Sequence, residues 1–149
     1  MGALQRDAAV GYAGRGWSVM PLRFTGGIEE RKRPLLDTWE PLKHQAAPVA
    51  QVTEWWQRWP EANIGLVMGA VSNLVALDLD GPAAVALLRQ REIFLPRTAA
   101  VQTARGYHAL YRHPGGTIAN LAKLLSHGQG SGVDVRGDGG YVVGPGSPH

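Results

Sequence analysis

Short apolar stretches, separated by glycine, proline and charged residues, alternate along the chain between helical and extended spacing. Apolar residues three or four positions apart predict helices over residues 4–13, 48–59, 82–94 and 118–125. Gly14 ends the first of these, Pro60 the second, and Gly128 would cap the last. The expected buried faces are Leu4, Ala8 and Tyr12 in the first helix and Val85, Leu88 and Phe94 in the third.

Runs of apolar or alternating residues predict strands between these helices. They cover residues 17–22, 63–69, 73–80, 98–103, 107–112, 133–136 and 141–144. Tight turns at residues 71–73, 104–106 and 137–140 each join two consecutive strands, so we expect three hairpins. Hairpins mixed with helices predict an α+β fold built on a mainly antiparallel sheet.

The most unusual strand is the one that ends in two acids. Asp78 and Asp80 follow an apolar run and precede Gly81. Residues i and i+2 of a strand point to the same face, so the two carboxylates lie side by side. Their repulsion requires a cation between them, a shared proton or open water. Mg²⁺ or Mn²⁺ is the sharpest of these options, and a strand that ends in a solvated turn is the plain alternative.

Two later strands carry further groups that can join this pair if all the hairpins share one sheet. His108 lies in one of them, and Asp134 lies between two valines in the other. Burial of a lone carboxylate is costly, and a metal ion would offset that cost. Three carboxylates on neighbouring strands suit one or two divalent metals that activate a hydroxyl and hold a triphosphate. The alternative for Asp134 is an interaction with Arg136 on the same face.

His108 could donate a hydrogen bond to a phosphate oxygen, and Arg105 and Arg136 could add positive charge beside it. Gly106 would let a ligand approach the backbone of the turn. A histidine in a strand is otherwise a locally hydrogen-bonded group.

The densest basic run in the chain is Arg31, Lys32 and Arg33, in a polar loop that also contains glycine. It is either a solvated loop or a contact to phosphate. Three tryptophans within residues 55–59 could stack on bases, but their helical spacing favours a place in the core.

Composition narrows the class of protein. The chain has 149 residues, 44% of them hydrophobic and 18% charged, with a formal charge of +3, which is typical of a folded globular protein. Without cysteine, the chain can form neither disulfides nor a thiolate zinc site. It has no apolar run of the roughly 20 residues that a membrane helix needs and no signal-peptide pattern. We therefore expect a cytoplasmic protein with no membrane partner.

Taken together, these blocks resemble the primase-polymerase (PrimPol) N-terminal domain of the archaeo-eukaryotic primase superfamily, found in phage, plasmid and bacterial replication proteins. The resemblance follows the chain in order, through residues 11–17, 19–22, 32–34, 55–66, 75–81, 103–108 and 132–143. The last block, Gly-Val-Asp-Val-Arg-Gly-Asp-Gly-Gly-Tyr-Val-Val, is the most specific, and its distance from the acidic pair matches the family pattern.

The resemblance implies one domain over residues 1–149, with a small N-terminal α/β portion up to about residue 70 and a catalytic portion similar to an RNA-recognition fold from about 71. It implies template-directed nucleotidyl transfer with Mg²⁺ or Mn²⁺, using a single-stranded template and nucleoside triphosphates. A helicase, as a C-terminal domain or a separate protein, is a further implied partner. By motif position, Asp78, Asp80 and Asp134 would bind the metal, and His108 would contact the phosphates, with Arg105, Gly106 and Arg136 beside it.

Relatives usually continue with further strands and helices, so we expect a domain truncated at its C-terminus. The alternative function is a catalytically incomplete nucleic-acid or nucleotide-binding module of a larger replication protein. A third hypothesis is a phosphohydrolase similar to the haloacid dehalogenases, because residues 78–81 read Asp-Leu-Asp-Gly. That motif is usually followed by threonine within βα units, whereas Pro82 follows here.

Overall fold

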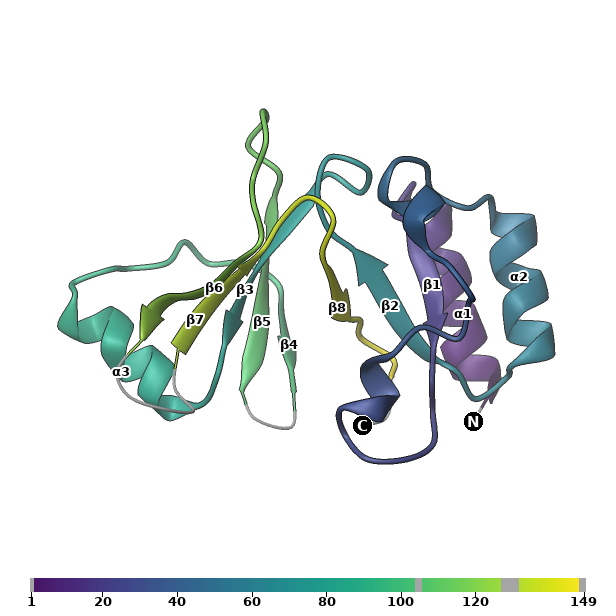
Figure 1. The fold of residues 1–149 in the computed structure, drawn as a ribbon, viewed down its shortest axis with the longest axis horizontal. Helices are drawn as coiled ribbons and strands as arrows, with labels where there is room; N and C mark the ends of the chain where they lie inside the picture. Colours follow the sequence, from purple (N-terminus) through teal and green to yellow (C-terminus); the bar gives the residue numbers. More distant parts are fainter. Residues whose placement is uncertain (1, 104–105, 127–131, 148–149) are drawn as a thin grey trace.

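The computed structural model describes residues 2–103, 106–126 and 132–147 and shows an α+β protein with two antiparallel sheets. The smaller sheet has the order β1-β2-β8 and the larger has the order β4-β5-β3-β7-β6 (Figure 1). The strands are β1 (Val19–Leu22), β2 (Asn63–Val67), β3 (Leu74–Leu79), β4 (Ala100–Gln102), β5 (Tyr107–Arg112), β6 (Leu121–Ser126), β7 (Gly132–Arg136) and β8 (Tyr141–Val143). The helices are α1 (Gly2–Gly14), α2 (Val49–Arg58) and α3 (Pro82–Gln90), with short 3₁₀ helices η1 (Glu30–Lys32) and η2 (Glu40–Lys43). Among the described residues, no helix is long and apolar enough to cross a bilayer.

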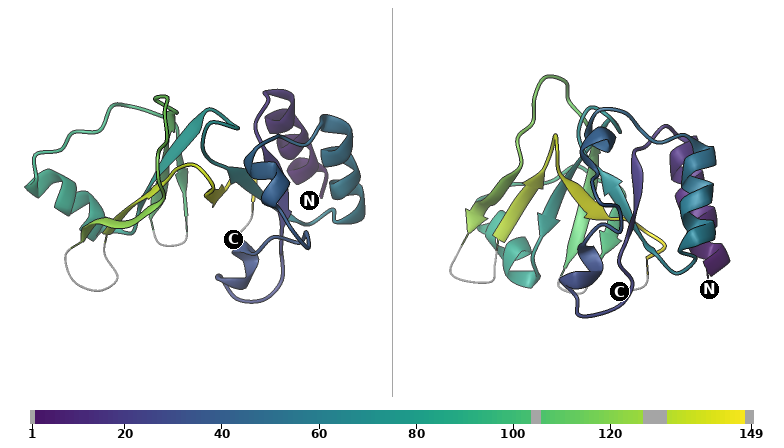
Figure 2. Two further views of the ribbon diagram at one scale, coloured as in Figure 1. Left: turned by 45° about the horizontal axis from the view of Figure 1, so that its top comes forward. Right: turned by 45° about the vertical axis from the view of Figure 1, so that its right-hand side comes forward.

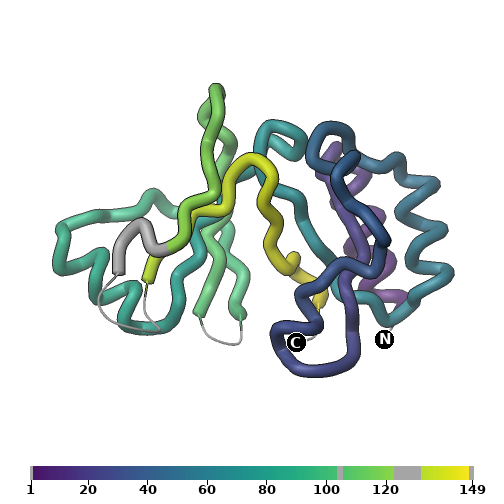
Figure 3. Tube along the Cα trace, viewed as in Figure 1, coloured from purple at the N-terminus to yellow at the C-terminus, as the bar shows by residue number. Residues whose placement is uncertain are grey.

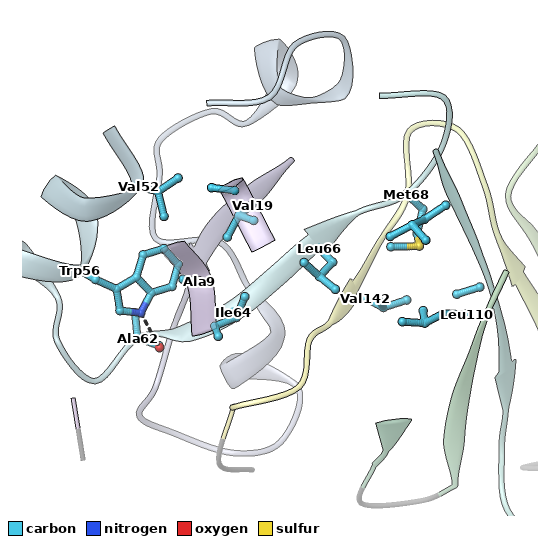
Figure 4. Close-up of a cluster of buried hydrophobic side chains, with 13 residues drawn as sticks. Ala9, Val19, Val52, Trp56, Ala62, Ile64, Leu66, Met68, Leu110 and Val142 are labelled. Atoms are coloured by element: carbon cyan, nitrogen blue, oxygen red, sulfur yellow. Dashed lines mark hydrogen bonds between the residues drawn. The ribbon is translucent and has the colours of Figure 1, made fainter. Parts of the chain in front are cut away.

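The smaller sheet, with α1 and α2 against it, forms what we call the N-terminal lobe (Figure 2). Val52 and Trp56 of α2 are buried against the sheet (Figure 4). The Trp56 side chain is 1% exposed, and its indole Nε1 donates a hydrogen bond to the Ala62 carbonyl at 3.2 Å. This confirms that Trp56 is a core residue. The buried face of α1 is Gln5, Ala9 and Ala13, one position on from the predicted face.

The larger sheet, which we call the five-stranded sheet, has two different faces. Leu79 of β3 lies opposite Val133 of β7, and both pack against Ala84 and Leu88 of α3. The predicted burial of Phe94 is wrong, because this side chain is 84% exposed. The helix has already ended at Gln90, and the chain turns away before reaching Phe94. The other face looks toward the N-terminal lobe.

The β4–β5 hairpin forms as predicted, but the other two predicted hairpins are wrong. The strands β2 and β3 belong to different sheets, as do β7 and β8, so the chain crosses between lobes twice (Figure 3). The turn over 137–140 itself is present, since the Gly140 N–H donates to the Gly137 carbonyl at 3.0 Å. The carbonyl of Gly140 then accepts from the Met68 N–H at 2.8 Å, which directs the next strand to β2. A turn motif specifies the reversal but not the partner strand.

Asp138 holds together the two segments in which the chain passes from one lobe to the other. Its Oδ1 accepts a hydrogen bond from the Ala70 N–H, and its Oδ2 accepts one from the Ile118 N–H, each at 2.8 Å. The His113 Nε2 lies 3.2 Å from the same Oδ2. These backbone donors, with a smaller contribution from His113, lower the pKa of Asp138 although desolvation opposes them. The carboxylate therefore stabilises the junction as an anion.

The segment predicted as a helix over residues 118–125 is instead the edge strand β6. Its pairing with β7 shifts register between Leu121 and Leu125, where four residues of β6 span two residues of β7. Such an irregularity lets helix-like apolar spacing exist in a strand, and pairing with β7 outweighed the local pattern. The expected cap at Gly128 lies outside the described residues.

Candidate active site

Three of the predicted groups lie on adjacent strands. In the five-stranded sheet, Asp78 of β3 is the register partner of both His108 on β5 and Asp134 on β7. The three side chains therefore share one face, opposite the face that α3 covers. Asp80 follows the last residue of β3, and its N–H donates to the Gly132 carbonyl at 3.1 Å. Its alternation with Asp78 keeps it on the same side.

The side chains of His108 and Arg136 bracket the paired acids. The His108 Nε2 lies 3.4 Å from Asp78 Oδ1. The Arg136 Nη2 lies 3.4 Å from Asp134 Oδ2 and 4.0 Å from Asp78 Oδ2, so its guanidinium faces both carboxylates. The interaction of Asp134 with Arg136, considered above as an alternative, is thus present. The acid side chains remain 28% and 26% exposed, which leaves them accessible to a ligand.

The charges around Asp78 decide its protonation. Desolvation on its own would raise the pKa of Asp78. The hydrogen bond and charge of His108, together with Arg136 and Lys32, outweigh it, so the pKa is lowered. Asp78 is therefore an anion at neutral pH. Lys32 belongs to the N-terminal lobe, so the field at this acid comes from both lobes.

These groups open into a cavity of about 700 Å³ between the lobes. From the side of the five-stranded sheet it is lined by Asp78, Asp80, Asp134, His108 and Arg136. From the N-terminal lobe come Lys32, Arg33 and Trp39, among others. The volume is within the usual range for a small-molecule ligand. A cleft with acids on one wall and cations on both suits a phosphate-bearing ligand held beside a metal.

The comparisons with known proteins agree with this geometry. The family model of the bifunctional DNA primase/polymerase N-terminal domain matches residues 9–149. The chain belongs to this family. No curated protein matches the chain significantly. The third hypothesis, a dehalogenase-like phosphohydrolase, finds no support in the fold, because both neighbours of β3 are antiparallel to it rather than part of βα units.

The remaining predicted residues of this primase/polymerase domain differ in their placement. Arg31 is not among the cavity-lining residues, and its Nε donates to the Gly26 carbonyl at 3.0 Å. Gly106 closes the β4–β5 turn through a 3.0 Å hydrogen bond from its N–H to Thr103 Oγ1, and it packs so closely on Leu79 that an added Cβ would collide with the Leu79 carbonyl. Arg105 lies outside the described residues.

Sequence reasoning missed the aromatic wall of the cavity. Trp39 and Tyr141 meet edge to face with ring centroids 5.1 Å apart, and both line the cavity. The Lys43 Nζ lies 4.5 Å from the centre of the Trp39 ring. The Tyr141 hydroxyl donates to the Lys32 carbonyl at 2.6 Å, which ties β8 to the basic loop. The only available signal was the position of Trp39 shortly after the basic run.

The donor set suits a hard divalent cation, because three carboxylates line one cavity. Their arrangement is not that of a preformed metal site: within the described ranges, no group of three or more His, Asp or Glu side chains is placed to hold an ion together. The guanidinium of Arg136 faces two of these carboxylates, Asp78 and Asp134, so a cation at this position would compete with it.

Proposed function

We propose that this domain catalyses template-directed nucleotidyl transfer from nucleoside triphosphates, dependent on Mg²⁺ or Mn²⁺. The carrying observation is the cross-strand pairing of Asp78 with Asp134, beside Asp80, in a cavity that Lys32 and Arg33 face from the other lobe. Membership of the primase/polymerase family supports the same reaction. The expected substrates are a single-stranded template and nucleoside triphosphates, in the replication of a phage, plasmid or bacterial element, with a helicase as a partner.

In the proposed reaction, a strand's 3′ hydroxyl attacks the α-phosphorus of the nucleotide, the bond to the β-phosphate breaks, and pyrophosphate leaves. Asp78, Asp80 and Asp134 would hold the divalent cation, which supplies charge neutralisation and lowers the pKa of the attacking hydroxyl. Lys32, Arg33 and His108 line the cavity and would bind the phosphate oxygens.

Arg136 has two roles in this proposal. Without ligand it neutralises the repulsion between Asp78 and Asp134. When the triphosphate and metal enter, its guanidinium would turn from the carboxylates to the phosphates, where it offers several N–H donors. The same side chain thus stabilises the empty site and the loaded site.

The test is primer extension on a single-stranded template with Mg²⁺ or Mn²⁺. Asp78→Asn and Asp134→Asn keep the side-chain shape but remove the charge, so each is expected to lower the extension rate by about 100-fold or more. Arg89→Gln, an exposed change on α3, is the matched control and should extend as the parent does. Equal synthesis by parent and both Asn variants would reject these carboxylates as the site.

The second candidate is a binding module that has lost catalysis. The observation that favours it is the absence of a preformed metal cluster in the described residues. Isothermal titration of Mn²⁺ into the parent and Asp78→Asn separates the two functions. Binding of Mn²⁺ that Asp78→Asn weakens, together with synthesis, supports the enzyme. Nucleic-acid binding with no synthesis under either metal supports the binding module.

A further inference from the structure

A second cavity, of about 430 Å³, lies between the lobes and is lined by residues that the proposed reaction does not use. Its walls come from the end of α1, the β2–β3 turn and the end of β5. The lining comprises Arg15, Gly16, Trp17, Val71, Ser72, Asn73, Leu74, Ala99, Leu110, Tyr111 and Arg112. We call it the rear pocket. It contains two arginines and the Trp17 ring but no acid. Tyr111 alternates with Leu110 and Arg112 along β5, so its ring lies on the opposite face of the sheet, where its hydroxyl donates to the Pro96 carbonyl at 2.9 Å.

Both arginines of the rear pocket lack a carboxylate partner. All twelve Asp and Glu side chains belong to the described residues. None of them forms an ion pair within 4.0 Å of Arg15 or Arg112. Two unneutralised guanidinium groups in one concave site favour an anion as the ligand.

One of these arginines is already positioned. The Arg15 guanidinium carbon lies 5.5 Å from the centre of the Trp17 ring. The Tyr12 ring stacks on Trp17 with centroids 5.4 Å apart, and the Tyr12 hydroxyl donates to the Pro145 carbonyl at 3.1 Å. A cation–π contact uses the face of the guanidinium and leaves its in-plane N–H donors available for phosphate oxygens. This arrangement lowers the entropy lost on binding.

The opposite wall of the rear pocket belongs to the strand that carries His108. Arg112 and Leu110 share a face of β5 with His108. Arg112 lies four positions along the strand from His108, a distance of about 14 Å. Buried residues, including Met68 and Val142, fill the junction between the lobes (Figure 4). The rear pocket and the catalytic cavity are therefore two separate sites along one sheet face.

We infer that the rear pocket binds one nucleotide of single-stranded DNA, with its phosphate between Arg15 and Arg112 and its base beside Trp17. Unpaired cations beside aromatic rings are the combination by which proteins hold single strands without reading their sequence. The side chain of Asn73 is exposed at the same pocket and offers an amide to the base edge. The choice of a DNA strand as the source of the phosphate rests on the proposed function, whereas the anion site itself does not.

The binding test uses a fluorescently labelled oligothymidylate in EDTA, with no nucleoside triphosphate, followed by anisotropy from 50 to 200 mM salt. Replacing both arginines, Arg15→Gln with Arg112→Gln, is expected to weaken binding about tenfold and to reduce the salt slope by about 0.7, because the contact to one phosphate is lost. The matched control is Arg89→Gln with Arg91→Gln, which removes the same charge from exposed positions at the C-terminal end of α3. Failure of the parent to bind, or an equal loss in both double variants, would overturn the inference.

Photocrosslinking of the parent locates the strand without any variant. An oligonucleotide carrying 5-iododeoxyuridine is expected to label a peptide that contains Trp17. Labels confined to Trp39 and Tyr141 would assign all binding to the catalytic cavity and overturn the inference. If micromolar dTMP abolished the rear-pocket label, the pocket would be a site for free nucleotides. That result would also overturn the inference. Asp78→Asn should retain the label, so a failure of catalysis and a failure of this site give different results.

Discussion

Asp78 and Asp138 are both held as anions, yet they differ in what holds them. Asp138 accepts hydrogen bonds from two backbone N–H groups, which the fold itself fixes. Asp78 is stabilised by the side chains of His108, Arg136 and Lys32, which can rotate away when a ligand arrives. A carboxylate bound by backbone donors serves the architecture, whereas one bound by side chains can exchange its partners. The comparison separates a structural acid from a candidate catalytic acid in the same chain.

The largest expected difference is between the melting temperatures of variants that lack Asp138 and variants that lack Asp78. Asp138→Ala leaves the two N–H groups and His113 without their acceptor, which should cost about 3 kcal/mol of unfolding free energy. That corresponds to a melting temperature about 6–12 °C lower. Asp78→Asn should lower the melting temperature less, because Asp78 is partly exposed and its partners are side chains rather than buried backbone N–H groups. The same change should remove extension activity. Thermal melts of both variants check this, and equal melting temperatures would remove the distinction between the two acids.

The next effect concerns the backbone that approaches Asp138. Gly69 has a φ of +106°, and an added Cβ would lie 2.6 Å from Asp138 Oδ1. Gly69→Ala should therefore destabilise the protein by about 2 kcal/mol. Gly11→Ala is the control, because that position is helical with open space around it, and it should be neutral or stabilising by up to about 1 kcal/mol. Denaturant unfolding measures both, and a neutral Gly69→Ala would show that the crossing can relax.

In the proposed active site, Arg136 would compete with a metal ion for Asp78 and Asp134. Arg136→Gln removes this positive charge and should tighten Mn²⁺ binding about tenfold, or about 1.4 kcal/mol, when no nucleotide is present. Isothermal titration measures the affinity, with Arg89→Gln as the control of equal charge change. Weaker Mn²⁺ binding in Arg136→Gln would show that the arginine organises the acids for the metal instead of occupying its place.

The smallest expected effect is the pH dependence of stability. Because the folded-state pKa of Asp138 is lowered, its contribution is fully present above the unfolded value near pH 4. It is lost as the pH falls through the lower folded-state pKa. Asp138→Asn should therefore lose less stability than the parent between pH 6 and pH 3 in urea unfolding. If the parent and Asp138→Asn lost the same unfolding free energy between pH 6 and pH 3, other carboxylates would account for the loss of stability in acid.

Several parts of the fold and site were predictable because they depend on local periodicity. The alternation of strand residues placed Asp78 and Asp80 on one face, and helical spacing identified Trp56 as a core residue. The β4–β5 pairing followed from a short turn between two strands. In each case the interaction that determines the local structure is between residues a few positions apart, so the sequence pattern predicts that structure.

The sequence by itself determined the α+β class, the family and the three carboxylates of the candidate site, since these follow from residue type and spacing. Only the tertiary structure decided that β8 returns to the N-terminal lobe, that residues 121–126 are a strand, and that Lys32 and Trp39 face the acids. The rear pocket belongs to this second group, because Arg15 and Arg112 are remote in sequence. The physical reason is that partner choice between strands and lobes depends on buried contacts between distant residues, which no local pattern encodes.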